Sequence, residues 1–156
     1  MADGRFHPLE FNPATKEPFL RLLPPHQNII ITPYRPTDAG FIVCHLNDPR
    51  ICATLLGPPY PYTEEHARFW IDQKTKETAQ IIDTLEHGDE QTLVEGCPVS
   101  VLRQVHEDGT DELLGDIGVH RSLWLDIVDE AERERLKAVN DQRSLTSLDL
   151  VWEIGG

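Results

Sequence analysis

Cysteine is scarce in this sequence, and the few cysteines present do not form the pattern of a disulfide framework. The chain has three, Cys44, Cys52 and Cys97, an odd number without regular spacing. Small disulfide-stabilised domains carry an even set of cysteines and fold outside the cytosol. The spacing of a zinc site is also missing when His45 and His66 are added. We therefore expect reduced thiols and no metal, which fits a cytoplasmic protein.

Long apolar runs are missing as well. No stretch approaches the roughly 18 to 20 consecutive apolar residues that a membrane span requires. The N-terminus, Met1-Ala2-Asp3-Gly4-Arg5, lacks the basic and then apolar segments of a secretory signal. Both observations argue against a membrane partner and make the cytoplasm the expected location.

Positive charge is the third deficit. The 14 lysines and arginines stand against 27 aspartates and glutamates, which leaves a formal net charge of −13. Such a chain repels a polyanion, so we expect no nucleic acid partner. The acidity is greatest in residues 107–116 and 126–134. These runs are either solvated surface, the usual role of charged segments, or an attraction for a cationic amine substrate.

The chain nevertheless contains enough apolar residues for one domain with a core. It has 156 residues, of which 39% are hydrophobic, and a chain of this length buries most of its apolar surface. Residues 1–27 hold several prolines and no sustained hydrophobic period. We interpret them as an extended lead-in to a domain over residues 28–156.

The first half of this domain combines one strand with three helices. Residues 28–32 are rich in isoleucine and predict a strand. Thr37 or Asp38 is the expected cap of a helix whose apolar residues recur at helical spacing. Two more helices are expected, a short one that begins at Asp48-Pro49 and a long one from Thr63 to Gly88.

The second half predicts a hairpin, an insertion and a last strand. Residues 98–105 and 113–119 have the pattern of a β-hairpin that turns at Asp108-Gly109. Residues 121–147 combine acidity with helical spacing, so we expect a mobile acidic helical insertion. Residues 148–156 alternate in the manner of a half-buried strand. This order predicts an α+β fold with a mixed, mostly antiparallel sheet flanked by helices.

Four segments of the domain resemble a known family. In their order and spacing they resemble the N-terminal part of the domain of the GNAT N-acetyltransferases, in the branch similar to the ribosomal-protein N-terminal acetyltransferases. The resemblance covers residues 28–156. The segments are Tyr34-Arg35-Pro36-Thr37-Asp38, the stretch from Gly57-Pro58-Pro59-Tyr60-Pro61-Tyr62-Thr63 to Trp70-Ile71, Leu114-Gly115-Asp116-Ile117-Gly118, and Trp152-Glu153-Ile154-Gly155.

The resemblance implies an acyl-CoA N-acyltransferase-like fold, acetyl-CoA as co-substrate, and a small-molecule or peptide primary amine as acceptor. In that family the fourth strand leads to a loop, Arg or Gln followed by x-x-Gly-x-Gly or Ala, whose backbone amides bind the cofactor diphosphate. This sequence ends at Gly155-Gly156 and has no such stretch elsewhere.

The expectation is therefore an N-acetyltransferase domain that is truncated after its fourth strand and incomplete for catalysis. The alternative is a non-catalytic remnant. It would act by pairing the exposed edge of its C-terminal strand with a partner protein, or with a second copy in a homodimer.

The resemblance also implies roles on the last strand. Glu153 lies where related enzymes often place the general base that takes a proton from the attacking amine. A backbone amide near Ile154 is the candidate contact on the cofactor side, for the oxyanion of the tetrahedral intermediate. For Glu153, a glutamate that only holds a β-bulge at the surface is an equal alternative.

Four further side chains are candidates for binding the acceptor. Tyr60 and Tyr62 in the proline-rich loop, together with Trp70 on the long helix, either form one wall of a pocket or pack in the core. Asp116 either binds a cationic substrate or pairs with Arg103 across the hairpin. The sequence leaves both pairs of alternatives open.

Overall fold

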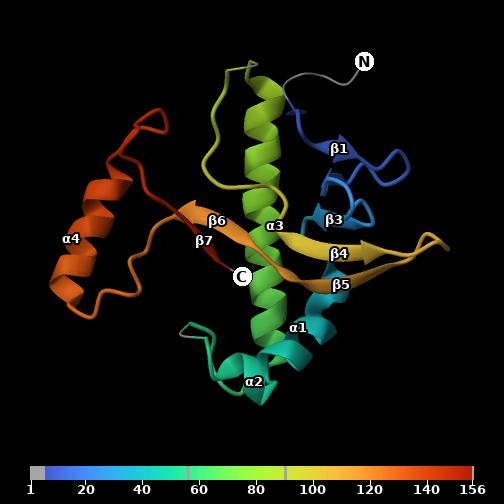
Figure 1. Cartoon of the computed structure of the whole chain (residues 1–156), viewed down its shortest axis with the longest axis horizontal. Helices are drawn as coiled ribbons and strands as arrows, with labels where there is room; N and C mark the ends of the chain where they lie inside the picture. The colour runs from blue at the N-terminus through green and yellow to red at the C-terminus, as the bar shows by residue number, and fades with distance from the viewer. Residues whose placement is uncertain (1–5, 56, 90, 156) are drawn as a thin grey trace.

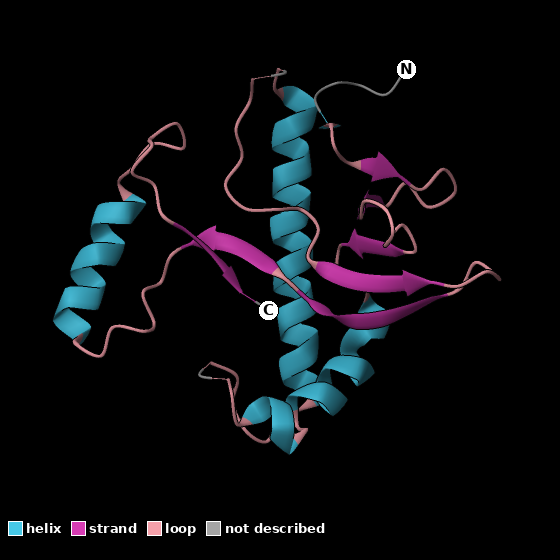
Figure 2. Ribbon diagram, viewed as in Figure 1, coloured by secondary structure: helices cyan, strands magenta, loops and turns pink. Residues whose placement is uncertain are grey.

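The computed structural model describes residues 6–55, 57–89 and 91–155 and has an α+β architecture (Figure 1). Five strands form one sheet in the order β1-β2-β3-β4-β5, and β6 and β7 form a separate two-stranded ribbon. Every strand pair in these ranges is antiparallel. The predicted α+β class with a mostly antiparallel sheet is confirmed. One long helix, α3, lies against the strands (Figure 2).

Two strands come from the segment interpreted as a lead-in. β1 (Glu10–Phe11) and β2 (Pro18–Arg21) form a short hairpin, and β2 pairs with β3 (Ile29–Thr32). Pro18 is the first residue of its strand, a position where the missing N–H is tolerated. Strands of two and four residues carry too little alternation to be recognised, so pairing with β3 decides their structure.

The first two helices begin where the sequence indicates. A 3-10 turn, η2 (Pro36–Asp38), leads directly into α1 (Ala39–Leu46). The short helix α2 (Pro49–Cys52) is capped by Asp48, whose carboxylate accepts the backbone N–H of Arg50 at 2.8 Å. A capping acceptor of this kind satisfies one of the backbone donors that a helix N-terminus leaves free.

The long helix α3 (Glu64–His87) has the predicted bounds. Thr63 Oγ1 accepts the His66 N–H, and His66 Nδ1 accepts the Thr63 N–H, so the two residues cap the helix reciprocally. Ala67 and Ile71, one turn apart, are buried on the face toward the sheet. The core cluster around them consists of Tyr34, Ala39, Tyr62, Ala67, Ile71, Val101 and Leu113.

One continuous stretch, residues 111–121, contributes a strand to the sheet and a strand to the ribbon. β4 (Val101–Val105) pairs with β5 (Asp111–Asp116), and after Ile117 the chain continues as β6 (Gly118–Arg121), which pairs with β7 (Trp152–Gly155). The Ile117 N–H donates to the Ser100 carbonyl at 2.7 Å, at the point where the run leaves the sheet. The hairpin predicted from the sequence is thus present, but its second strand changes partner partway along.

The helix α4 (Glu130–Asp141) lies within the segment expected as an insertion, on the far side of the ribbon from α1 (Figure 1). Its Asn140 is fully buried. The Asn140 amide group donates to the Val151 carbonyl at 2.8 Å and accepts the Val151 N–H at 2.9 Å. These two bonds imitate a strand pairing and tie the end of α4 to the residue that precedes β7.

A buried arginine joins the sheet to α1. Arg103 on β4 is only 3% exposed. Its guanidinium donates to Asp38 at 2.6 Å and to Thr32 Oγ1 at 2.8 Å, and a longer contact of 3.4 Å reaches Asp111. Asp38 also accepts the Arg35 N–H at 2.7 Å. A charge buried this deeply is tolerated only when its donors are all matched by acceptors.

A second arginine extends this network toward the surface. The guanidinium of Arg35 holds both oxygens of Asp111, at 2.9 and 2.8 Å, and both oxygens of Glu17, at 2.8 and 2.6 Å. Hydrogen bonds to Glu17, with a smaller contribution from Asp111, raise the pKa of Arg35 against the opposing effect of burial. Through Glu17 the network reaches the loop between β1 and β2.

Replacing Arg103 should therefore destabilise the whole domain. Arg103→Met leaves Asp38 buried without its partner, and we expect the free energy of unfolding to fall by about 3–5 kcal/mol in urea denaturation. The matched control is Arg68→Met, which removes an exposed i, i+4 pair with Glu64 and should cost less than about 1 kcal/mol. Equal losses in the two variants would show that the Arg103 network does not carry the stability.

Candidate functional site

A large cavity opens between the helices and the end of the β4–β5 hairpin. Its volume is about 1060 Å³. Helices α1 and α2 form one side, the start of α3 forms another, and β5 forms the floor. The side chains that line it are mainly apolar or aromatic and include Tyr34, Phe41, Ile42, Leu46, Ile51, Leu55, Pro58, Pro59, Tyr62, Phe69, Trp70, Val101, Leu113 and Leu114. Such a concave apolar surface is the usual form of a small-molecule site.

The loop before α3 is held in place by one asparagine. Asn47, at the end of α1, donates from Nδ2 to the Tyr62 carbonyl at 2.7 Å and accepts the Tyr62 N–H at 2.9 Å. The same Nδ2 donates to the Val43 carbonyl within α1 at 2.8 Å. These bonds fix the loop against α1, so the Tyr62 ring is buried between the helices and the sheet.

The floor of the cavity carries a tyrosine and aspartate pair. The buried Tyr34 hydroxyl donates to Asp116 Oδ2 at 2.8 Å. Burial raises the pKa of Tyr34 above its usual range; the charge of Asp116 adds to this, and a hydrogen bond with Trp70 opposes it. Burial and the Asp116 charge raise the pKa of Tyr62 in the same way. The negative charge of Asp116 thus contributes to the raised pKa of both buried tyrosines.

The rim of the cavity carries the remaining charged and titratable groups. Arg50 binds Asp48 at 2.6 Å, and this hydrogen-bonded pairing lowers the pKa of Asp48 to about 2. His45 donates from Nδ1 to the Phe41 carbonyl at 3.0 Å, the direction that a carbonyl acceptor requires. Glu65 completes the rim on α3. The one arginine of the lining is therefore already neutralised by a neighbour outside it.

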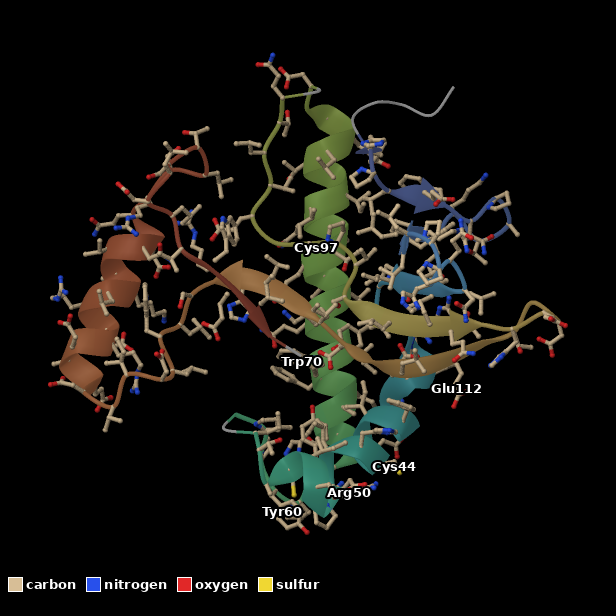
Figure 3. The ribbon with its side chains drawn as sticks, viewed as in Figure 1. Cys44, Arg50, Tyr60, Trp70, Cys97 and Glu112 are labelled. Carbon is tan, nitrogen blue, oxygen red and sulfur yellow. The ribbon has the colours of Figure 1, made fainter. Side chains whose placement is uncertain are left out.

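Three of the four side chains predicted for the acceptor side line this cavity. Tyr62, Trp70 and Asp116 come from separate segments and meet around one space. Tyr60 is not among the lining residues and is 70% exposed. Figure 3 shows Tyr60 beside α2 with Arg50, whereas Trp70 lies farther along α3 near the strands.

The alternative partner considered for Asp116 is wrong. Arg103 does not pair with Asp116; its partners are Asp38, Thr32 and Asp111. In the hairpin, Asp116 is opposite Val101, whereas Arg103 is opposite Leu113. A register shift between Leu102 and Arg103 separates the two positions further. This leaves the Asp116 carboxylate to Tyr34 and to the cavity.

The two residues assigned to the last strand lie outside this cavity. Glu153 on β7 accepts, through one oxygen, the Ser122 hydroxyl at 3.2 Å and the Leu123 N–H at 3.0 Å. Ile154 pairs in register with Val119 of β6, and its side chain is exposed. Neither residue is among those that line the space beside Asp116. The Glu153 carboxylate thus binds the start of the loop that follows β6.

Tyr34 is the residue of the site that sequence reasoning missed. In the sequence it is simply one residue of the segment that follows the first strand, and no pattern there gives it a role. The available signal was its position between a β-branched strand and a proline-started helix, where a tyrosine is directed into the core with its hydroxyl seeking a partner. The partner, Asp116, is 82 residues away in sequence, so no local pattern connects the two.

A metal or a diphosphate would need ligands that the described residues do not bring together. They contain no group of three or more His, Cys, Asp or Glu side chains placed to hold a metal. Each described helix of eight or more residues starts with carboxylates: Asp38 before α1, Glu64 and Glu65 in α3, and Asp129 and Glu130 at α4. The carboxylates of α3 and α4 disfavour phosphate at those starts, and at α1 the buried Asp38–Arg103 pair occupies that position, so none of the three suits the diphosphate of acetyl-CoA.

Comparisons with known proteins do not place this chain in a family. No protein-family model, no curated protein and no solved structure matches the chain. A search of the described helices for one long and apolar enough to cross a membrane found none.

The anchoring role of Glu153 can be measured as stability. Glu153→Ala removes the acceptor of two hydrogen bonds at the end of the ribbon, and we expect the free energy of unfolding in urea to fall by about 1–3 kcal/mol. Glu107→Ala, an exposed glutamate in the hairpin turn, is the matched control and should change stability by less than about 0.5 kcal/mol. An unchanged midpoint for Glu153→Ala would contradict the anchoring role.

The raised pKa of Tyr34 predicts how stability depends on alkaline pH. Above its usual value of 10.0 the unfolded chain loses this proton while the folded chain keeps it. The unfolded state then binds fewer protons, so stability falls as pH rises from about 10. Tyr34→Phe should make that fall less steep by up to about 1.4 kcal/mol per pH unit in urea titrations. The exposed Tyr60→Phe should leave the slope unchanged, and equal slopes in both variants would contradict the assignment.

Proposed function

We propose that this chain carries the amine-binding part of an acyl-CoA-dependent N-acetyltransferase domain of the GNAT type. In the proposed reaction a primary amine takes the acetyl group of a thioester. The new N–C bond forms, the thioester C–S bond breaks, and the thiol leaves with the proton that the amine gives up. The acceptor amine is the substrate that this chain binds.

The observation that carries the proposal is the cavity beside Asp116. Tyr62, Trp70 and Asp116 were chosen from the sequence as acceptor-side residues, and all three line this one cavity. It is lined by residues from three of the segments on which the family resemblance rests, among them Tyr34, Tyr62 and Asp116, and by residues of α1, which lies outside those segments. A concave apolar site with one convergent carboxylate suits a substrate with an amino group.

The cofactor side of the reaction is supported less by the described residues. No helix start among them suits a diphosphate, because each carries acidic residues. The proposal therefore assigns the chain no contact with the diphosphate of acetyl-CoA and derives no catalytic step from that group. Both Glu153 and Ile154 lie on β7, outside the amine cavity. The Glu153 carboxylate is kept as the proposed base, and the Ile154 amide as the proposed oxyanion contact.

The acetyl donor provides the test. The chain is incubated with a panel of primary amines and either acetyl-CoA or S-acetylpantetheine, a thioester without the diphosphate. Acetylated amine is measured by mass spectrometry, because the exposed Cys44 and Cys97 would consume a thiol reagent. We expect product above the protein-free reaction with both donors, at comparable rates, since the described residues offer the diphosphate no site.

Two results would speak against this expectation. Product no higher than in the protein-free reaction, with both donors and all amines, would contradict the transferase proposal. A rate at least about tenfold higher with acetyl-CoA, the effect of one charge-assisted contact, would contradict the conclusion on the diphosphate alone.

A further inference from the structure

We propose that the cavity selects arylalkyl primary amines, which bind with the ammonium group on Asp116 and the aromatic body against the rings of α1 and α3. The inference deepens the proposed function by naming the class of acceptor, and it rests on that function for the reaction that follows binding. The binding itself follows from the charge, the hydrogen bonding and the shape of the cavity.

The charge of the cavity favours a cation. Asp116 and Glu65 are its carboxylates, and Arg50, its arginine, is held by Asp48 at 2.6 Å. Across residues 6–55, 57–89 and 91–155, the ion pairs do not include Asp116. Lys74 on α3, which is not among the lining residues, lies over the Trp70 ring at 4.7 Å and binds Glu77 at 2.7 Å. The Asp116 charge is therefore available to a ligand.

Tyr34 orients the Asp116 carboxylate. Its hydroxyl donates to Oδ2 at 2.8 Å. Tyr34 is buried and Asp116 is exposed, so this hydrogen bond ties an accessible carboxylate to the core. An ammonium group donates up to three hydrogen bonds and accepts none, so the remaining acceptor capacity of this carboxylate suits it. Tyr34 is a positioning residue, because it acts on the ligand through Asp116.

The walls favour a flat aromatic body. The rings of Phe41 and His45 on α1 stack with centroids 3.7 Å apart and an interplanar angle of 17°. Tyr62 and His66 form a second pair with centroids 5.4 Å apart. Trp70 already carries the Lys74 ammonium on its ring, which shows that this region accepts a cation beside an aromatic surface. A flat ring that packs against the outer face of either pair buries apolar area at little conformational cost.

The size of the cavity excludes a bare ammonium ion as the preferred ligand. Its volume of about 1060 Å³ lies at the upper end of ordinary small-molecule sites. Methylamine fills a small part of that space and leaves the apolar walls in contact with water. Affinity should therefore grow with the aromatic body as well as with the charge.

The test compares three ligands on the unaltered chain by isothermal titration calorimetry at pH 7. The first is 2-phenylethylamine, which has both charge and ring; the second is 2-phenylethanol, which is neutral and of similar shape; the third is methylamine, which has charge alone. We expect 2-phenylethylamine to bind at least about tenfold more tightly than either of the others. Equal affinities for the amine and the alcohol would overturn the role of charge, and equal affinities for the two amines would overturn the role of the ring.

Substitutions locate the ammonium site. Asp116→Asn keeps the acceptor for Tyr34 but removes the charge, and it should weaken 2-phenylethylamine binding about tenfold while leaving 2-phenylethanol unchanged. The matched control is Asp126→Asn, an exposed aspartate between β6 and α4 that does not line the cavity, and it should bind both ligands as the unaltered chain does. Equal losses in the two variants would overturn the assignment to Asp116.

Tyr34→Phe tests the positioning role through a readout that packing alone would not change. Without the hydroxyl, the affinity for 2-phenylethylamine should fall while that for 2-phenylethanol is retained, because only the ammonium uses the oriented carboxylate. A parallel fall for both ligands would show that Tyr34 only supports the walls.

The outcome also separates this inference from the proposed function. Selective binding of 2-phenylethylamine without acetyl transfer from any thioester supports the amine site and contradicts the transferase. Acetyl transfer that is indifferent to Asp116→Asn and to the aromatic ring supports the transferase and contradicts the amine site described here.

Discussion

The buried guanidinium of Arg103 is the interaction on which the rest of the structure depends. It lies on β4 and binds Thr32 of β3, Asp38 at the start of α1 and, at longer range, Asp111 of β5. A charge with 3% exposure cannot exchange these partners for water without a large cost in free energy. Because the guanidinium needs all three partners at once, it fixes the position of α1 relative to the sheet.

The cavity is a consequence of that placement. With Asp38 held by Arg103, α1 starts at the sheet and runs away from it toward α2 (Figure 1). The small side chain of Ala67 lets α3 approach the core closely, and Asn47 draws the loop before α3 against α1. The helices α1 and α3 therefore pack against the sheet near Ala67. Toward α2 they diverge, and the cavity lies in the space between them.

The position of Asp116 follows from a change of partner along one strand. β5 ends at Asp116, the chain passes Ile117, and β6 then pairs with β7 in place of β4. The carboxylate thus lies at the point where the sheet and the ribbon diverge, beside the cavity. On the other side of this divergence, Glu153 and Asn140 hold the loop after β6 and the end of α4. One continuous run of chain therefore separates the side with the cavity from the side where Glu153 and Asn140 hold the chain.

The sequence by itself determined the features that depend on neighbouring residues. The caps Asp48 and Thr63 and the reversal at Asp108-Gly109 each act over a few positions, so the short helix, the long helix and the hairpin were all predictable. The aromatic and acidic side chains Tyr62 and Asp116 were also recognisable as candidates, because their residue types suit an amine site.

Only the tertiary structure decided which of these residues meet. Tyr34 and Asp116 are 82 residues apart, and Arg103 and Asp38 are 65 apart. Such pairs form because buried donors and charges must find partners wherever the packed elements bring them, a condition that no local pattern records. The same condition gave Arg103 to Asp38 rather than to Asp116. Pairing with β3, another contact between distant segments, made a strand of residues 18–21.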